Sequence, residues 1–139
     1  MSAEPLRGLH ILVVDDDAIA RRVVTGLLEH CGALVTATDS AESAWLSLAR
    51  IIPEVIVCAV GLGGGRDAYM LLHRVRTSGS PAAVRVPAVA ILRAQDPRTL
   101  NDVLEAGFTG YVKAPFEPRQ LCGVIADVAD AHPRERRPD

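Results

Sequence analysis

Residues 9–17 read LHILVVDDD, a short apolar run that ends in three consecutive aspartates. The run Leu9–Val14 is too short for a helix, and its β-branched side chains are typical of a central strand in a parallel sheet. Either Asp16 or Asp17 can cap a helix that then runs to about His30. This stretch therefore predicts a buried strand, an acidic turn and a helix, in that order.

The same alternation of apolar runs and amphipathic stretches continues along the rest of the chain. Strands that alternate with helices through short connections are typical of parallel βαβ units with right-handed crossovers. We therefore predict one α/β domain, a doubly wound, five-stranded parallel sheet with five helices. The other strands are expected at 33–38, 54–60, 87–92 and 110–113, the other helices at 39–51, 66–77, 97–106 and from Pro118 onward, and a loop at 78–85.

The predicted domain spans residues 9–131. Residues 1–8 are expected to form an N-terminal extension, and the charged, proline-punctuated residues 132–139 a flexible tail. The net charge is −2 and aromatic residues make up 4 % of the chain. Both values argue against a nucleic-acid partner, because phosphate binding needs a basic excess and base stacking needs aromatic rings.

The sequence indicates neither a membrane segment nor a structural zinc site. No run approaches the roughly 18 apolar residues of a membrane span. Cys31, Cys58 and Cys122 are far apart, each lies in an apolar run, and no CxxC spacing occurs. The reducing cytoplasm is the predicted location.

The aspartate cluster has two interpretations. In a doubly wound sheet, ligands bind outside the carboxyl ends of the strands, where Asp15, Asp16 and Asp17 would lie. Crowded carboxylates repel one another, and a hard cation such as magnesium would relieve that repulsion. Alternatively, one aspartate caps the helix and the others are solvated near its positive end. Three aspartates exceed what one cap needs, which favours a site.

A glycine-rich stretch, GLGGG at residues 61–65, follows the third predicted strand. Such turns can hold anions at a helix N-terminus. The stretch lacks the GK[ST] ending of a phosphate-binding loop, so a flexible strand-to-helix turn is the favoured interpretation.

Four motifs occur in order along the chain: ILVVDDD at 11–17, PEVIV at 53–57, DAYMLLHRVR at 67–76 and EAGFTGYVKAPF at 105–116. Together they resemble the receiver domain of bacterial response regulators. The resemblance covers about Leu9 to Ala131 and implies a flavodoxin-like (βα)5 fold. It also implies phosphoryl transfer from a histidine kinase onto an aspartate that ends the third strand, with magnesium bound by an acidic pair and with a Ser/Thr and a Lys contacting the phosphoryl group.

Three of the positions implied by this resemblance carry other residues. The acceptor position falls on Ala59, the hydroxyl position on Leu92 and the lysine position on Ala114, while Lys113 is one residue early. Alanine has no nucleophile, so an acyl phosphate cannot form at residue 59. Since successive strand residues alternate faces, the Lys113 side chain is expected to point away from the site.

Other positions match the receiver pattern. Asp15 and Asp16 match the acidic pair, and with the backbone carbonyl near Gly61 they would be the remaining magnesium ligands. Loss of the acceptor carboxylate lowers the affinity of an oxygen-ligand site, so magnesium binding is expected to be weak or vestigial. Tyr111 matches the aromatic switch position, and with Lys113 it is predicted to lie on the partner face.

We therefore predict a degenerate receiver domain that acts by phosphorylation-independent protein–protein interaction and is not an enzyme. It requires no cofactor, and its expected partner is a histidine kinase or a downstream signalling protein. By family analogy the partner face is formed by 97–106, 110–113 and the helix from Pro118, or by the first helix. Homodimerisation through the same face is an alternative.

Two other functions are weighed against this prediction. In the first, phosphorylation occurs at a displaced aspartate, Asp16 or Asp17. In the second, Asp15 is the nucleophile and Asp17 the general acid of a haloacid-dehalogenase-like phosphatase. The second is disfavoured because no Gly-Thr follows the aspartates and no late acidic metal motif occurs.

Overall fold

The computed structural model describes residues 4–93, 95–98 and 100–131. Five strands in this part of the chain form one parallel sheet in the order β2-β1-β3-β4-β5. The predicted five-stranded, doubly wound parallel sheet is confirmed. The strands are β1 (His10–Val14), β2 (Leu34–Thr38), β3 (Val55–Ala59), β4 (Ala88–Leu92) and β5 (Gly110–Lys113).

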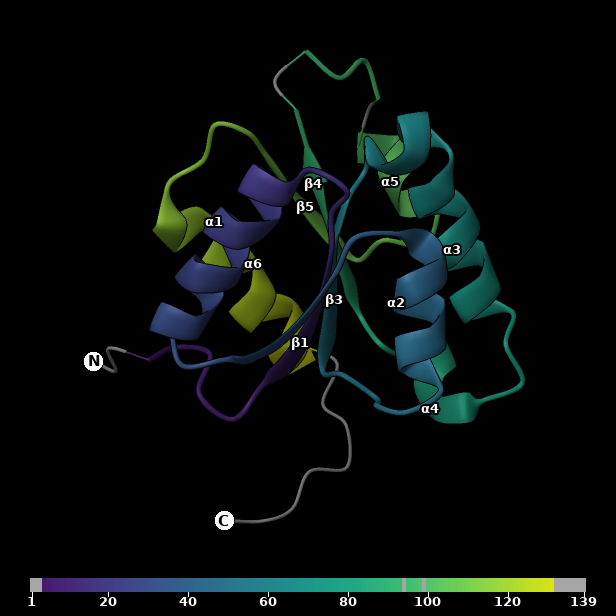
Figure 1. Cartoon of the computed structure of the whole chain (residues 1–139), viewed down its shortest axis with the longest axis horizontal. Coiled ribbons are helices and arrows are strands. Elements are labelled where there is room, and N and C mark those ends of the chain that lie inside the picture. Colours follow the sequence, from purple (N-terminus) through teal and green to yellow (C-terminus); the bar gives the residue numbers. More distant parts are fainter. Residues whose placement is uncertain (1–3, 94, 99, 132–139) are drawn as a thin grey trace.

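Helices cover both faces of the sheet (Figure 1). Helices α1 and α6 lie on one face, and α2, α3 and α5 lie on the other. Helix α1 begins directly after Asp17, which is its N-cap, and Gly32 follows its end with a φ of 98°, as the left-handed position after a helix requires. The helical elements are α1 (Ala18–His30), α2 (Ala41–Leu48), the 3-10 helix η1 (Leu62–Gly65), α3 (Asp67–Arg76), α4 (Pro81–Val84), α5 (Leu100–Glu105) and α6 (Pro118–Ala131).

The core is divided between the two faces of the sheet. Ile11 and Val13 belong to the cluster that contains Leu28 of α1 and Ile125 of α6. The alternate residues of β1 belong to a second cluster, with side chains of α2, α3 and α5. Because both faces are covered, the strands are apolar along their length, and polar side chains gather where the strands end.

The helices differ from the prediction in three places: α2 is Ala41–Leu48 where 39–51 was predicted, and the other two concern α4 and α5. Residues 78–85, predicted as a loop, contain the short helix α4, so five helices was one too few; Ser80 caps α4 by accepting the amide of Ala83 at 3.3 Å. Helix α5 begins at Leu100 rather than at 97. The amide of Arg98 is bound by the side chain of Asp96 at 2.9 Å, which favours a turn before the helix.

Part of the predicted N-terminal extension packs against the domain. Leu6 is fully buried in the cluster beneath α1 and α6, and its amide donates to the carbonyl of Cys31 at 2.9 Å. The tail predicted at 132–139 lies outside the described residues. None of the helices described is long and apolar enough to cross a membrane.

Candidate functional site

A pocket of about 330 Å³ lies where β1, β3 and β5 end. It is lined by all three aspartates of the first stretch together with residues that follow β3, β4 and β5. The α1 helix forms one side of the pocket through Ala20, Val23 and Val24. Lining residues that had been named from the sequence are Asp15, Asp16, Asp17, Ala59, Gly61 and Ala114.

Each aspartate accepts a hydrogen bond from the backbone. One carboxylate oxygen of Asp17 accepts the amides of Ile19 at 2.9 Å and Ala20 at 3.0 Å, so this side chain is the cap of α1. The carboxylate of Asp15 accepts the amide of Asp17 at 2.9 Å. The carboxylate of Asp16 accepts the amide of Gly63 at 3.1 Å and so joins the β1–α1 turn to η1.

The carboxyl groups of Asp15 and Asp17 have opposite pKa shifts. Burial raises the pKa of Asp15, which is 7 % exposed, and the negative charges of Asp16 and Asp17 add to this effect. The Asp17 amide opposes the shift by stabilising the charged form. The hydrogen bond from Ala20 lowers the pKa of Asp17, assisted by that from Ile19.

Arg93, which the sequence analysis did not single out, also lines this pocket. Its positive charge lowers the pKa of both Asp15 and Asp17, although it is not the largest cause for either. The arginine follows β4 by one residue, on the side of the sheet that faces α1. Strand alternation from Ile91, which lines the same pocket, is the signal that could have found it.

Sheet register explains why Leu92 and Lys113 lie elsewhere. Ala59 is paired with Ile91, whereas Leu92 is paired with Lys113, and successive residues of a strand point to opposite faces. Leu92 is 2 % exposed and belongs to the core beneath α2 and α3. A separate pocket of about 340 Å³ is lined by Leu92, Tyr111 and Lys113. The ammonium of Lys113 is thus on the other face, as strand alternation predicts.

The donor set does not match the magnesium site that the receiver resemblance implies. Asp15 and Asp16 supply two carboxylates, but Ala59 supplies a methyl group where the third would be. One oxygen of Asp16 is already bound by the Gly63 amide, and the pocket contains a cationic side chain. Within the described ranges, no three His, Cys, Asp or Glu residues are grouped to hold a metal ion. Weak binding by Asp15, Asp16 and Gly61 therefore stays a prediction.

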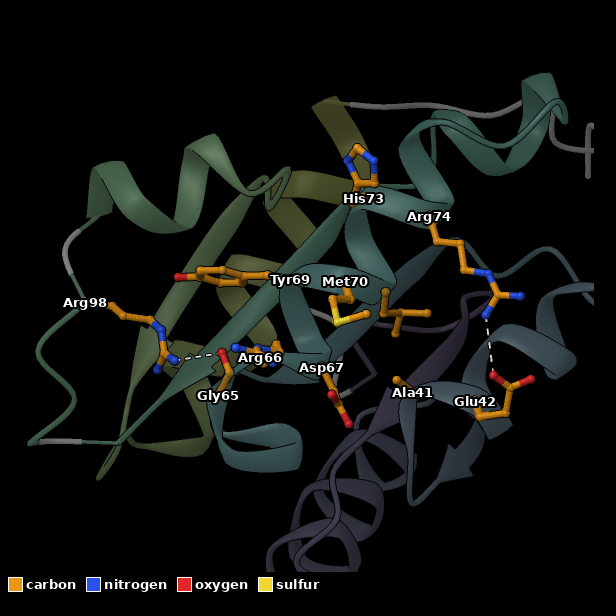
Figure 2. A pocket seen from close by; sticks show the side chains of 11 residues that line it. Ala41, Glu42, Gly65, Arg66, Asp67, Tyr69, Met70, His73, Arg74 and Arg98 are labelled. Atoms are coloured by element: carbon orange, nitrogen blue, oxygen red, sulfur yellow. Dashed lines mark hydrogen bonds and ion pairs between the residues drawn. The ribbon is translucent and has the colours of Figure 1, made fainter.

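A larger groove of about 850 Å³ lies between α2 and α3, away from the aspartates (Figure 2). Arg98 and Gly65 both line this groove, and the guanidinium of Arg98 donates to the carbonyl of Gly65 at 2.7 Å. At the other end Arg74 approaches Glu42 at 3.4 Å. None of the site residues named from the sequence lines this groove.

The fold and the pocket define a class of protein: a doubly wound α/β domain with an acidic pocket at the carboxyl ends of its central strands. A family model described as the response regulator receiver domain matches residues 11–126, and the chain belongs to this family. It is therefore a receiver domain of two-component signalling.

Similar proteins include both small and large chains. An uncharacterized 14.6 kDa protein of Leptolyngbya boryana is 31 % identical over 130 residues, which are 94 % of this chain and 97 % of that protein. Probable histidine kinase 5 of Oryza sativa subsp. japonica is also 31 % identical, over 91 % of this chain but 12 % of the kinase. Among solved structures, a putative response regulator from Chloroflexus aurantiacus J-10-fl has a TM-score of 0.80 and 28 % identity, over 88 % of this chain and 98 % of that one.

Proposed function

We propose that this receiver domain acts by binding a protein partner and is not switched by phosphorylation. The observation that carries the proposal is Ala59, the last residue of β3, whose methyl group lies in the same pocket as Asp15 and Asp16. Acyl-phosphate formation needs a carboxylate nucleophile at that position, and a methyl group has no lone pair to attack phosphorus.

The surroundings of Ala59 support the same proposal. Ala114 lines the pocket without a charge, and the ammonium of Lys113 lies on the opposite face of the sheet. At the end of β4 the pocket is lined by Ile91 and Arg93, neither of which has a hydroxyl group to donate to a phosphoryl oxygen, while Leu92 is packed in the core on the other face of the sheet. The groups that would bind and stabilise a phosphoryl group are therefore replaced together, which is why we propose no catalytic activity and no required cofactor.

An apolar surface on α5 and β5 is the proposed partner face. Leu100 and Leu104 are one helical turn apart and are 46 % and 45 % exposed, and Tyr111 is 39 % exposed. Leu100 and Tyr111 line the same pocket as Lys113, which places a positive charge at the rim of the apolar surface. Interfaces favour an apolar or aromatic centre with a polar rim. A histidine kinase or a downstream signalling protein in the cytoplasm is the proposed partner.

A second exposed apolar surface lies on α1. Ile19 and Val23 are one turn apart and largely exposed, and Val23 also lines the acidic pocket. This surface is the alternative docking face, and the two can be separated by substitution. Loss of binding in Leu104→Asp but not in Ile19→Asp supports the α5–β5 face, and the reverse result favours α1.

The phosphorylation proposal is tested by incubation with acetyl phosphate and magnesium, followed by intact-mass measurement. We expect no gain of a phosphoryl group, while a receiver domain with the strand-three aspartate gains one in the same buffer. A gain that is lost in Asp16→Asn or Asp17→Asn would show a displaced acceptor and contradict the proposal. Hydrolysis of an aryl phosphate that is abolished in Asp15→Asn would instead support a phosphatase.

A further inference from the structure

Two cysteines from distant parts of the chain meet beneath α1 and α6. Cys31 is the C-cap of α1, and Cys122 lies in the second turn of α6. Their sulfur atoms are 2.8 Å apart, although 91 positions separate the residues in sequence. Two packed carbon atoms stay about 3.5–4.0 Å apart, so this contact is much closer than ordinary packing. A disulfide bond of about 2.05 Å needs a further approach of only about 0.8 Å.

The surroundings keep the two sulfur atoms in place. Cys122 is 4 % exposed and packs in the same apolar cluster as Leu28 and Ile125. The amide of Cys31 donates to the carbonyls of Leu27 and Leu28, and its carbonyl accepts the amide of Leu6. Both thiols are free in the structure. The fold has therefore already brought them into position for a bond.

We propose that Cys31 and Cys122 form an oxidation site that a hydroperoxide converts into an intramolecular disulfide. Cys31 lies at the end of α1 opposite the acidic pocket. The 13 residues of this helix place Cys31 about 20 Å from Asp17. The proposed oxidation does not depend on how the protein partner is bound or on whether the domain is phosphorylated.

The oxidation occurs in two steps that balance. The Cys31 thiolate attacks one peroxide oxygen, an S–O bond forms, the O–O bond breaks, and the leaving oxygen takes up a proton to become water or an alcohol. The sulfur of Cys122 then attacks the sulfenic sulfur, an S–S bond forms, the S–O bond breaks, and the thiol proton leaves with the hydroxide as water. Two thiols are oxidised by two electrons in all, and one hydroperoxide is reduced.

The order of the two cysteines follows from their exposure. Cys31 is partly exposed and can meet a peroxide. Burial raises the pKa of Cys122 to about 12, and the hydrogen bond with Cys31 adds to the shift, so Cys122 carries little thiolate in neutral solution. Cys58 is fully buried, and burial raises its pKa strongly. It has no role in the proposal and is the internal reference.

The test counts thiols in the whole chain. Reduced protein is treated with hydrogen peroxide, unfolded in an alkylating reagent, and analysed by intact mass and peptide mapping. We expect that only one of the three thiols is still alkylated after peroxide treatment. Peptide mapping should find one disulfide-linked pair, which joins Cys31 to Cys122, and dithiothreitol should restore all three thiols. Cys58 should remain alkylated. The oxidised domain should also unfold at a higher temperature than the reduced one, because the cross-link constrains the unfolded chain.

Single variants separate the roles of the two sulfur atoms. In Cys122→Ser, peroxide should leave a sulfenic acid at Cys31 that dimedone traps, and no intramolecular disulfide should form. In Cys31→Ser, dimedone should trap nothing at Cys122. Three alkylated thiols after peroxide treatment, a disulfide that includes Cys58, or disulfides only between separate chains would each overturn the proposal.

Discussion

Arg76, the last residue of α3, donates to the backbone of two separate turns. Its Nη1 donates to the carbonyls of Val84 at 3.0 Å and Val86 at 2.6 Å, at the end of α4 and the approach to β4. Its Nε and Nη2 donate to the carbonyl of Gly107 at 3.2 Å and 2.8 Å, between α5 and β5. Burial lowers the pKa of this guanidinium, but it stays charged at every working pH. We predict that Arg76→Met strongly destabilises the domain.

The size of the effect follows from the three carbonyls that lose their donor. A hydrogen bond to a charged group contributes about 1.5–3 kcal/mol to stability. After the substitution, water can bind to a carbonyl in place of the guanidinium, so the net loss for each carbonyl is smaller than this. With about 1 kcal/mol for each carbonyl, the loss is about 3 kcal/mol out of the 5–15 kcal/mol typical of a domain. For a chain of this length, that loss lowers the unfolding temperature by roughly 10 °C.

Urea and thermal unfolding followed by circular dichroism measure this loss. Arg74→Met is the matched control, because its side chain is half exposed and its guanidinium makes only a 3.4 Å contact with Glu42 and a stacking contact with the Trp45 ring, whose centroid is 4.1 Å away. Exposed contacts of these two kinds contribute about 1 kcal/mol or less each. Arg76→Lys should be intermediate, since one ammonium cannot span both turns. The argument is wrong if Arg76→Met unfolds within about 1 kcal/mol of the parent.

Three further predictions concern the acidic pocket, η1 and the partner face. Because burial raises the pKa of Asp15, the unfolded chain ionises first as the pH rises past about 4, and the folded state loses stability. In metal-free buffer Asp15→Asn should therefore be more stable than the parent at pH 7, and the difference should shrink toward pH 3; urea titrations at both pH values check this. Gly65→Ala should cost about 1–3 kcal/mol in chemical unfolding, because residue 65 has a φ of 98° and a β-carbon would meet the guanidinium of Arg98. Leu104→Asp should abolish partner binding in a pull-down while lowering stability by only about 1 kcal/mol, because nearly half of the side chain is already exposed.

The strands and the longer helices could be predicted because local signals and tertiary packing agree there. Pro118 starts α6 and Asp17 caps α1, as the sequence indicates. The short helix α4 was missed although Ser80 and Pro81 are ordinary start signals, because four residues carry no measurable hydrophobic period. The start of α5 was predicted three residues too early because the Asp96 side chain binds the amide of Arg98 in a turn before the helix. The bond from the Arg98 side chain to the carbonyl of Gly65 joins distant parts of the chain and has no local signature.

The site, like the fold, has residues that the sequence predicted and residues that it did not. Strand ends and side-chain alternation place Ala59, Ala114 and the aspartates in one pocket and Lys113 outside it, and these follow from the sequence alone. The side on which Arg93 lies follows from strand alternation after Ile91, so the sequence held a signal for it that was not used. The meeting of Cys31 with Cys122 has no such signal, because it depends on how α6 packs against α1 after folding.

The three aspartates of the acidic turn have a structural role that does not depend on phosphoryl chemistry. Asp17 caps α1, Asp15 holds the amide of Asp17, and Asp16 holds the amide of Gly63 in η1. Truncating any of these side chains to alanine leaves a backbone amide without its side-chain acceptor, whatever residue 59 is. The pKa of Asp15 is raised mainly by burial, and the neighbouring negative charges of Asp16 and Asp17 add to the shift. The positive charge of Arg93, which lies in the same pocket, opposes this shift by stabilising the ionised carboxylates of Asp15 and Asp17.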